Sequence, residues 1–142
     1  MIETDGKQPK STRLLAETGR YSLLALYEDV YLIEKSTGHE LWRTSMFGDP
    51  DCGIIAANNQ WAVAGGQDLI IWFNQELSIL GDVDLQWIHD LRQTGDKQIE
   101  VLIDPWSEKS AIWKFELDNS QKTKIRDFND YKERPFKEVV TW

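Results

Sequence analysis

The chain has 142 residues, enough for one domain with a sizeable hydrophobic core but too few for two comfortable ones. Its 41% hydrophobic residues and seven tryptophans argue against intrinsic disorder, and its formal net charge of −8 argues against nucleic acid as a direct partner and favours a basic protein. The single cysteine, Cys52, excludes an internal disulfide and favours a reducing compartment.

The first eleven residues are polar and predict a flexible lead-in. They include Lys7, Pro9 and Lys10 and contain none of the apolar core of a signal peptide. No later apolar run is long enough to cross a bilayer. We therefore expect residues 1–142 to form a single cytoplasmic domain without a membrane partner.

From residue 12 onward the chain repeats with a period of about 40 residues. Shifted by 40, segments within 13–24 align with segments within 53–64, and a one-residue deletion then aligns 29–33 with 68–72. A third and looser copy follows. A repeat of this size indicates one supersecondary unit stacked on copies of itself, because a single unit cannot bury its apolar face alone.

Each copy contains four short strand-forming runs separated by turn signals. The copies span 12–46, 53–82 and 85–126, and their expected strands are 13–18, 21–27, 30–34 and 40–44; 53–57, 61–64, 69–73 and 77–80; and 87–92, 98–104, 111–117 and 123–125. Turns every eight to twelve residues predict an all-β fold of three consecutive four-stranded antiparallel meanders. The run 69–73 is apolar throughout, so it belongs between two packed sheets, as in a propeller blade or, alternatively, a β-sandwich.

The last segment, 127–142, is expected to cover one end of the stack. A final strand over 136–142 is favoured over a short helix at 129–132, which Pro135 would end.

Residues 29–42 carry a resemblance to a known fold family. They read Asp-Val-Tyr-Leu-Ile-Glu-Lys-Ser-Thr-Gly-His-Glu-Leu-Trp, which resembles the blade signature of quinoprotein-type β-propellers: a strand, a Thr-Gly turn and a strand carrying Trp. Gly38 would supply the positive φ of the hairpin, and Trp42 would lie flat against the next blade. WD-repeat propellers are a looser match, through the Ile-Trp pairs at 71–72 and 112–113.

The resemblance implies an architecture and no activity. The quinone- and calcium-binding parts of quinoprotein dehydrogenases have no counterpart here, so no cofactor is expected. Closed propellers have about four to eight blades, whereas this chain holds three. The three units would form an open arc, complete a ring by self-association or rearrange into a sandwich, and the free protein would be a monomer or a homodimer.

Residues with catalytic or metal-binding chemistry are sparse. His39 falls at a predicted hairpin tip, and Cys52 has no histidine near it in sequence. His89 and Asp90 are neighbours on a predicted strand, where adjacent side chains point to opposite faces, so they cannot both hold one metal ion. We expect no catalytic residue, no metal and no enzymatic activity, since an enzyme built on paired carboxylates finds no supporting spacing.

Charge is distributed unevenly along the chain. Residues 51–108 hold ten acidic and two basic residues, a local charge of −8, and four tryptophans. Aromatic anchors among carboxylates are typical of an interface that steers in a basic partner, although buried tryptophans and solubilising carboxylates would give the same composition. Of the four, Trp72 is expected to be the most buried and Trp106 the most exposed. The expected partner-binding residues are Asp82, Asp84, Asp90, Glu100, Asp104 and Trp106.

In class, though not in sequence, the chain resembles bacterial toxin-immunity proteins. Such small acidic antitoxins neutralise a basic nuclease toxin by masking its active cleft. We therefore expect a non-enzymatic protein-binding module whose partner is a basic toxin domain. Charge reversal at Asp82, Asp84 or Asp104 should weaken binding more than reversal at Glu3 or Asp5. The alternative is a propeller-like scaffold or assembly subunit of a larger complex.

Overall fold

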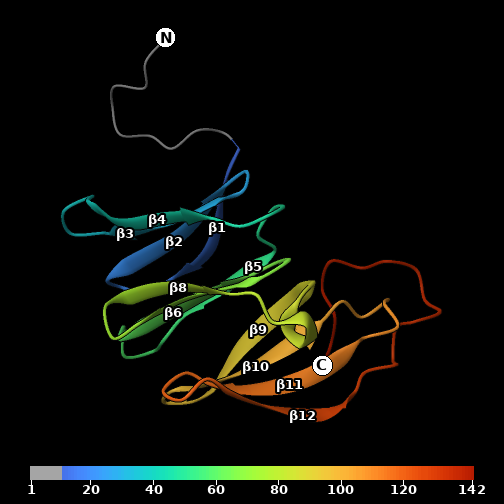
Figure 1. The fold of residues 1–142 in the computed structure, drawn as a ribbon. Coiled ribbons are helices and arrows are strands. Elements are labelled where there is room, and N and C mark those ends of the chain that lie inside the picture. The colour runs from blue at the N-terminus through green and yellow to red at the C-terminus, as the bar shows by residue number, and fades with distance from the viewer. Residues whose placement is uncertain (1–10) are drawn as a thin grey trace.

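The computed structural model describes residues 11–142, which form three separate four-stranded antiparallel sheets (Figure 1). The first sheet, blade 1, contains β1 (Thr12–Glu17), β2 (Tyr21–Leu26), β3 (Asp29–Glu34) and β4 (Glu40–Ser45). Blade 2 contains β5 (Cys52–Ile55), β6 (Trp61–Gly65), β7 (Leu69–Phe73) and β8 (Glu76–Leu80). After the short 3-10 helix η1 (Val83–Leu85), blade 3 contains β9 (Ile88–Gly95), β10 (Gln98–Ile103), β11 (Ala111–Glu116) and β12 (Gln121–Asp127).

This arrangement confirms the predicted all-β fold of three consecutive meanders. Within each blade the strands pair in sequence order, so every connection is a hairpin. Residues 1–10 lie outside the described residues. They include most of the flexible lead-in predicted over 1–11 and both reference positions for charge reversal, Glu3 and Asp5.

The three blades stack as an open, propeller-like arc. The first strand of each blade is innermost: β1 contacts β5, and β5 contacts β9. Blades 1 and 3 lie at opposite ends of the arc, with blade 2 between them (Figure 1). The sheets therefore do not form the two facing layers of a sandwich.

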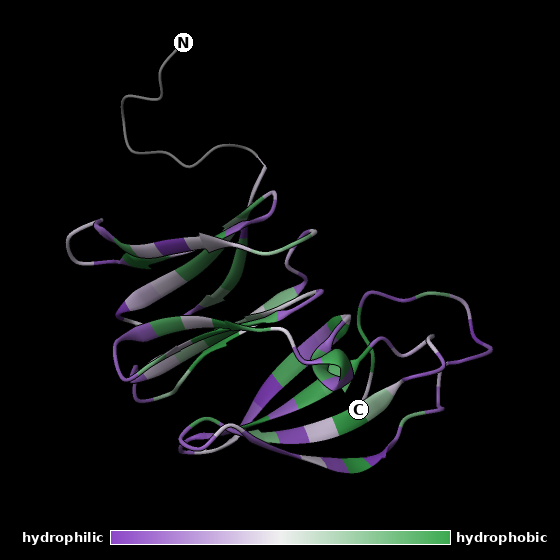
Figure 2. Cartoon of the chain, viewed as in Figure 1, coloured by the Kyte–Doolittle hydropathy of each residue, from purple (hydrophilic) through white to green (hydrophobic). Residues whose placement is uncertain are grey.

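The hydrophobic core lies in two layers, one on each side of blade 2. Between blades 1 and 2, Leu23 and Leu32 meet Ile70, and between blades 2 and 3 a larger cluster surrounds the fully buried Trp61. Strand β7 contributes to both layers, which explains why its sequence lacks polar alternation. Figure 2 shows hydrophobic residues along the strands and hydrophilic residues at many turns and along much of the C-terminal loop.

Neighbouring blades approach too closely for a side chain at two glycines, Gly53 on β5 and Gly65 on β6. A Cβ on Gly53 would lie 2.7 Å from Leu23 Cδ2, and one on Gly65 would lie 2.7 Å from Ile88 Cγ2. Both distances are below van der Waals contact, so glycine at these positions sets the spacing of the blades.

The Thr-Gly turn of blade 1 has the predicted conformation. Gly38 has φ 74°, and its N–H donates to the Glu34 carbonyl at 2.8 Å. Trp42 packs on blade 2 as expected, but its ring is tilted 46° to that of Trp72, with centroids 6.3 Å apart. Tyr21 stands edge-on to Trp72 in the same layer, with centroids 5.7 Å apart.

The C-terminal segment contains no strand or helix after Asp127, so the strand predicted over 136–142 and the helix considered at 129–132 are both wrong. The segment crosses the face of blade 3 that points away from blade 2, and its apolar side chains pack on that face. Apolar side chains of the segment and of blade 3 form a cluster separate from the two core layers. It contains Leu102, Ile112, Phe128, Tyr131 and Val140. We call residues 128–142 the C-terminal strap.

Candidate functional site

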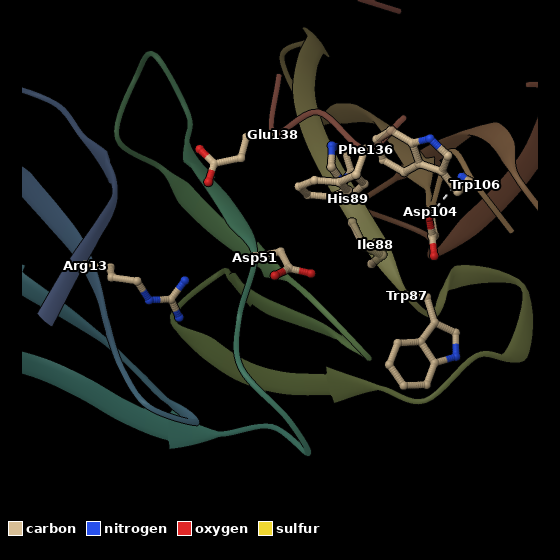
Figure 3. Close-up of a pocket in the computed structure, with 9 residues that line it drawn as sticks. All are labelled: Arg13, Asp51, Trp87, Ile88, His89, Asp104, Trp106, Phe136 and Glu138. Atoms are coloured by element: carbon tan, nitrogen blue, oxygen red, sulfur yellow. Dashed lines mark hydrogen bonds between the residues drawn. The ribbon is translucent and has the colours of Figure 1, made fainter. Parts of the chain in front are cut away.

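The larger of the two described cavities lies where the inner strands of the three blades begin. It has a volume of about 720 Å³ and is open to solvent. Its lining comes from β1, the linker before β5, the start of β9, the loop after β10 and the C-terminal strap (Figure 3). The lining residues are Arg13, Asp51, Trp87, Ile88, His89, Asp104, Trp106, Phe136 and Glu138.

Backbone hydrogen bonds hold the acidic and aromatic residues at the cavity. The Asp51 N–H donates to the Gly65 carbonyl at 2.8 Å, which fixes the linker against the edge of β6. The Asp104 N–H donates to the Trp87 carbonyl at 2.8 Å and joins the loop after β10 to the start of β9. Trp87 itself has φ 57°, a left-handed conformation that costs a bulky residue on the order of 1 kcal/mol and turns the chain from η1 into β9.

Trp106 is the fixed centre of an aromatic cluster. Its ring centroid lies 5.0 Å from that of Phe136, 5.7 Å from His89 and 5.9 Å from Tyr131. Its indole Nε1–H donates to the Arg134 carbonyl at 3.0 Å. Trp87 is 60% exposed and Phe136 is 70% exposed, so both present uncovered ring surface at the cavity.

Three carboxylates and one guanidinium also line the cavity. Asp104 Oδ1 accepts the backbone N–H of Trp106 at 3.0 Å. Within residues 11–142, the side chains of Asp51, Glu138 and Arg13 form no hydrogen bond or ion pair. Desolvation by the cavity walls raises the pKa of Asp51, although Coulombic interactions with His89 and Arg13 act in the opposite direction. Among the lining residues the three carboxylates outnumber the one guanidinium, so the cavity has an excess of acidic groups.

This geometry can bind a cation against aromatic rings and shows no catalytic constellation. No group of three or more metal-ligating side chains gathers anywhere in the described part of the chain. Burial raises the pKa of the Cys52 thiol well above its usual value, and the thiol donates to the Gly65 carbonyl at 3.7 Å. A thiol that stays protonated is a poor nucleophile.

Two of the six predicted partner-binding residues, Asp104 and Trp106, line the cavity. The other four lie elsewhere and have intramolecular partners. Lys122 on β12 binds Asp82 at 2.6 Å and Asp84 at 2.7 Å.

Asp90 and Glu100 support the end of the C-terminal strap. The Trp142 Nε1–H donates to Asp90 Oδ2 at 2.9 Å, and Arg92 stacks on the Trp142 ring at 3.9 Å while pairing with Glu100 at 2.6 Å. The structure therefore divides the six predicted residues among three places, and a role for all six in binding one partner stays a prediction.

The expected ranking of tryptophan exposure is wrong at both ends. Trp61, not Trp72, is fully buried, and Trp87, at 60% exposed, is more exposed than the half-buried Trp106. Trp106 lies beside Pro105 in a loop, as expected, but the C-terminal strap covers part of its ring through Tyr131 and Phe136.

The sequence contained one signal for the cavity, which is the position of its residues within the repeat. Arg13, Asp51 and Trp87 all lie at the start of a repeat, and the first strands of propeller blades begin at one end of the arc. The contribution of Phe136 and Glu138 had no such signal, because the strap folds back without secondary structure.

Comparison with known proteins supports the fold. No protein-family model matches the chain, and no curated protein matches its sequence. Among solved structures, the chain is similar to Kuenenia stuttgartiensis hydrazine synthase, with a TM-score of 0.59 and 9% identity over 78% of this chain and 36% of that one.

It is also similar to the RRP9 WD40 repeats, with a TM-score of 0.61 and 7% identity over 78% of this chain and 35% of that one. The chain thus spans just over a third of the length of these neighbours and shares a propeller-type fold with them. No helix in residues 11–142 is long and apolar enough to cross a membrane.

Proposed function

We propose that this chain is a non-enzymatic binding module that docks a basic protein over the cavity at the ends of its inner strands. The observation that carries the proposal is the cavity lining, which sets three carboxylates against one guanidinium beside exposed Trp87 and Phe136 rings. Aromatic rings supply buried contact area in protein interfaces, and carboxylates raise the rate of encounter with a cationic partner.

The finer form of this proposal is that the partner is a nuclease-type toxin domain and that the chain is its immunity protein. It is supported by the net charge of −8, which is complementary to a phosphate-binding cleft, and by the small size of the chain. The protein would act by occupying the cleft and excluding the nucleic acid substrate.

A second candidate is a scaffold or assembly subunit that docks through the outer face of blade 1. This face points away from blade 2 and exposes apolar side chains, with Leu14 53% and Leu41 44% exposed. The propeller-type neighbours support the scaffold architecture itself. This candidate predicts an apolar interface, whereas the first predicts an acidic one.

The two candidates are separated by capture experiments with tagged full-length protein and its variants. An Asp51→Asn/Glu138→Gln double variant removes two cavity charges, and a matched Glu76→Gln/Asp118→Asn variant removes two exposed charges elsewhere. Docking at the cavity predicts that the first variant weakens capture of a basic protein by at least about tenfold and the second by less than about twofold, because each lost charge-assisted contact contributes about 1.5–3 kcal/mol.

Three further results distinguish the proposed functions. Capture that is insensitive to salt between about 50 and 500 mM would contradict steering by carboxylates. Loss of capture only in Leu14→Lys would favour the scaffold. The immunity reading requires that the captured protein is toxic when expressed alone and harmless when co-expressed with this chain.

A further inference from the structure

We propose that the cavity is a subsite for one arginine side chain of the docked partner. This inference rests on the proposed function and assigns the chemical group that the site recognises. It follows from the shape of the aromatic walls, from the free hydrogen-bond acceptors and from the balance of charge.

The aromatic walls fit a planar cation. Trp87 and Phe136 are mostly exposed, so their ring faces are open to a ligand, while Trp106 is held in place by ring contacts and by its hydrogen bond to the Arg134 carbonyl. A guanidinium group can stack on an aromatic ring and still donate hydrogen bonds in its own plane. An ammonium group is compact and strongly hydrated, so it gains less from flat walls.

Most of the carboxylate oxygens around these rings accept no hydrogen bond from residues 11–142. Asp51 and Glu138 have no side-chain partner among residues 11–142, and Asp104 engages only Oδ1, through the Trp106 N–H. A guanidinium offers five N–H donors, enough to serve two carboxylates at once. The desolvation that raises the pKa of Asp51 also means that a bound cation would relieve an existing cost.

The charge balance leaves room for an added cation. Arg13 projects into the same cavity from blade 1, on the side of Asp51 away from the aromatic cluster (Figure 3). Its one guanidinium faces three carboxylates among the lining residues, so a bound arginine would not give the cavity a net positive charge. The volume of about 720 Å³ exceeds that of one side chain, so residues flanking the arginine can enter the mouth.

The test uses the full-length protein and Nα-acetyl-arginine amide, followed by the indole N–H signals in ¹⁵N–¹H NMR spectra. We expect saturable shifts of the Trp87 and Trp106 signals with a Kd on the order of millimolar, typical of one small polar group. The Trp61 signal serves as an internal control, because its Nε1–H is buried and bound to the Asp96 carbonyl at 2.8 Å. Nα-acetyl-citrulline amide, which has the same shape without charge, should produce no saturable shift.

Variants assign the binding to this cavity. Asp51→Asn should weaken arginine amide binding about tenfold through loss of a charge-assisted hydrogen bond, and Glu76→Gln should leave it unchanged. Arg13→Gln should strengthen it by about twofold, because it removes a like charge that solvent partly screens. A structural defect would not produce opposite effects at two residues of one cavity.

Two results would overturn the inference: no saturable shift with arginine amide, or equal shifts with citrulline amide. Failure here is distinct from failure of the proposed function. If arginine amide does not bind but the Asp51→Asn/Glu138→Gln variant still loses its protein partner, the docking site stands and the arginine subsite is rejected. If arginine amide binds and no protein requires the cavity, the subsite stands and protein docking is rejected.

Discussion

Asp51 places a carboxylate in the cavity mouth without a hydrogen bond to its side chain from any described residue, and desolvation raises its pKa above the usual 3.8. For an acid, a raised folded-state pKa means that the native state binds more protons than the unfolded state between the two pKa values. Its charged form therefore opposes folding, and stability falls as pH rises through that window.

Replacement of Asp51 by asparagine should accordingly stabilise the protein at neutral pH. Because the side chain still reaches solvent, we expect a gain of at most about 0.5 kcal/mol in the free energy of unfolding. The gain should shrink as pH falls toward 3.8 and vanish about one unit below it, where both states of the wild type are protonated. Urea unfolding at about pH 7 and about pH 2.8 measures it, with the exposed Glu76→Gln as the control; a loss of stability at neutral pH would contradict the assigned environment.

At the scale of the elements, the strands were predictable, whereas the irregular structure of the C-terminal strap was not. The repeat placed turns at regular intervals, and the all-apolar run at β7 correctly indicated burial on both faces, because two core layers meet there. The Thr-Gly turn was predictable too, because the hairpin requires a positive φ and Gly38 has one. Residues 128–142 carry no periodicity, since their structure is set by the apolar face of blade 3 beneath them.

The candidate site was also predictable only in part, because it depends on contacts between segments that are distant in the sequence. Asp104 and Trp106 come from the acidic, aromatic segment that the composition singled out. Which carboxylates stay free depends on ion pairs between distant strands, such as Lys122 on β12 with Asp82 beyond β8. Local charge density cannot reveal such pairs, because they join residues 40 positions apart.

The outer strand of blade 1 offers an element-scale test through Trp42. Its ring packs between the blades, but its buried Nε1–H finds no acceptor within residues 11–142. Trp42→Ala should destabilise the protein by about 2 kcal/mol or more through lost packing. Trp42→Phe should cost much less, because it keeps a ring in the core and removes the unsatisfied donor. Thermal and urea unfolding compare the two; equal losses would show that the indole N–H is satisfied.

The molecule as a whole is an arc whose two ends differ. The outer face of blade 1 exposes Leu14 and Leu41, whereas the corresponding face of blade 3 is covered by the strap. Head-to-tail association of copies would pair these two faces and would build open chains or rings. The strap covers the blade 3 face, so we expect it to oppose this association.

Deletion of residues 128–142 should therefore turn the protein into a concentration-dependent oligomer. The deletion uncovers Leu102 and Ile112, which the strap buries, and these can then receive the outer face of a second copy's blade 1. Light scattering after size-exclusion chromatography should show mass rising with concentration for the truncated chain and not for the full-length chain.

Charge placed on blade 1 tests whether the new contact uses that face. In the truncated chain, Leu14→Lys should restore the monomer, because a cation would be buried against the apolar face of blade 3. Leu77→Lys, at a 37% exposed position on the outer strand of blade 2, should leave the oligomer intact. If the truncated chain stays folded and monomeric by circular dichroism and scattering, or if both lysine variants dissolve the oligomer equally, then the strap does not govern association through blade 1.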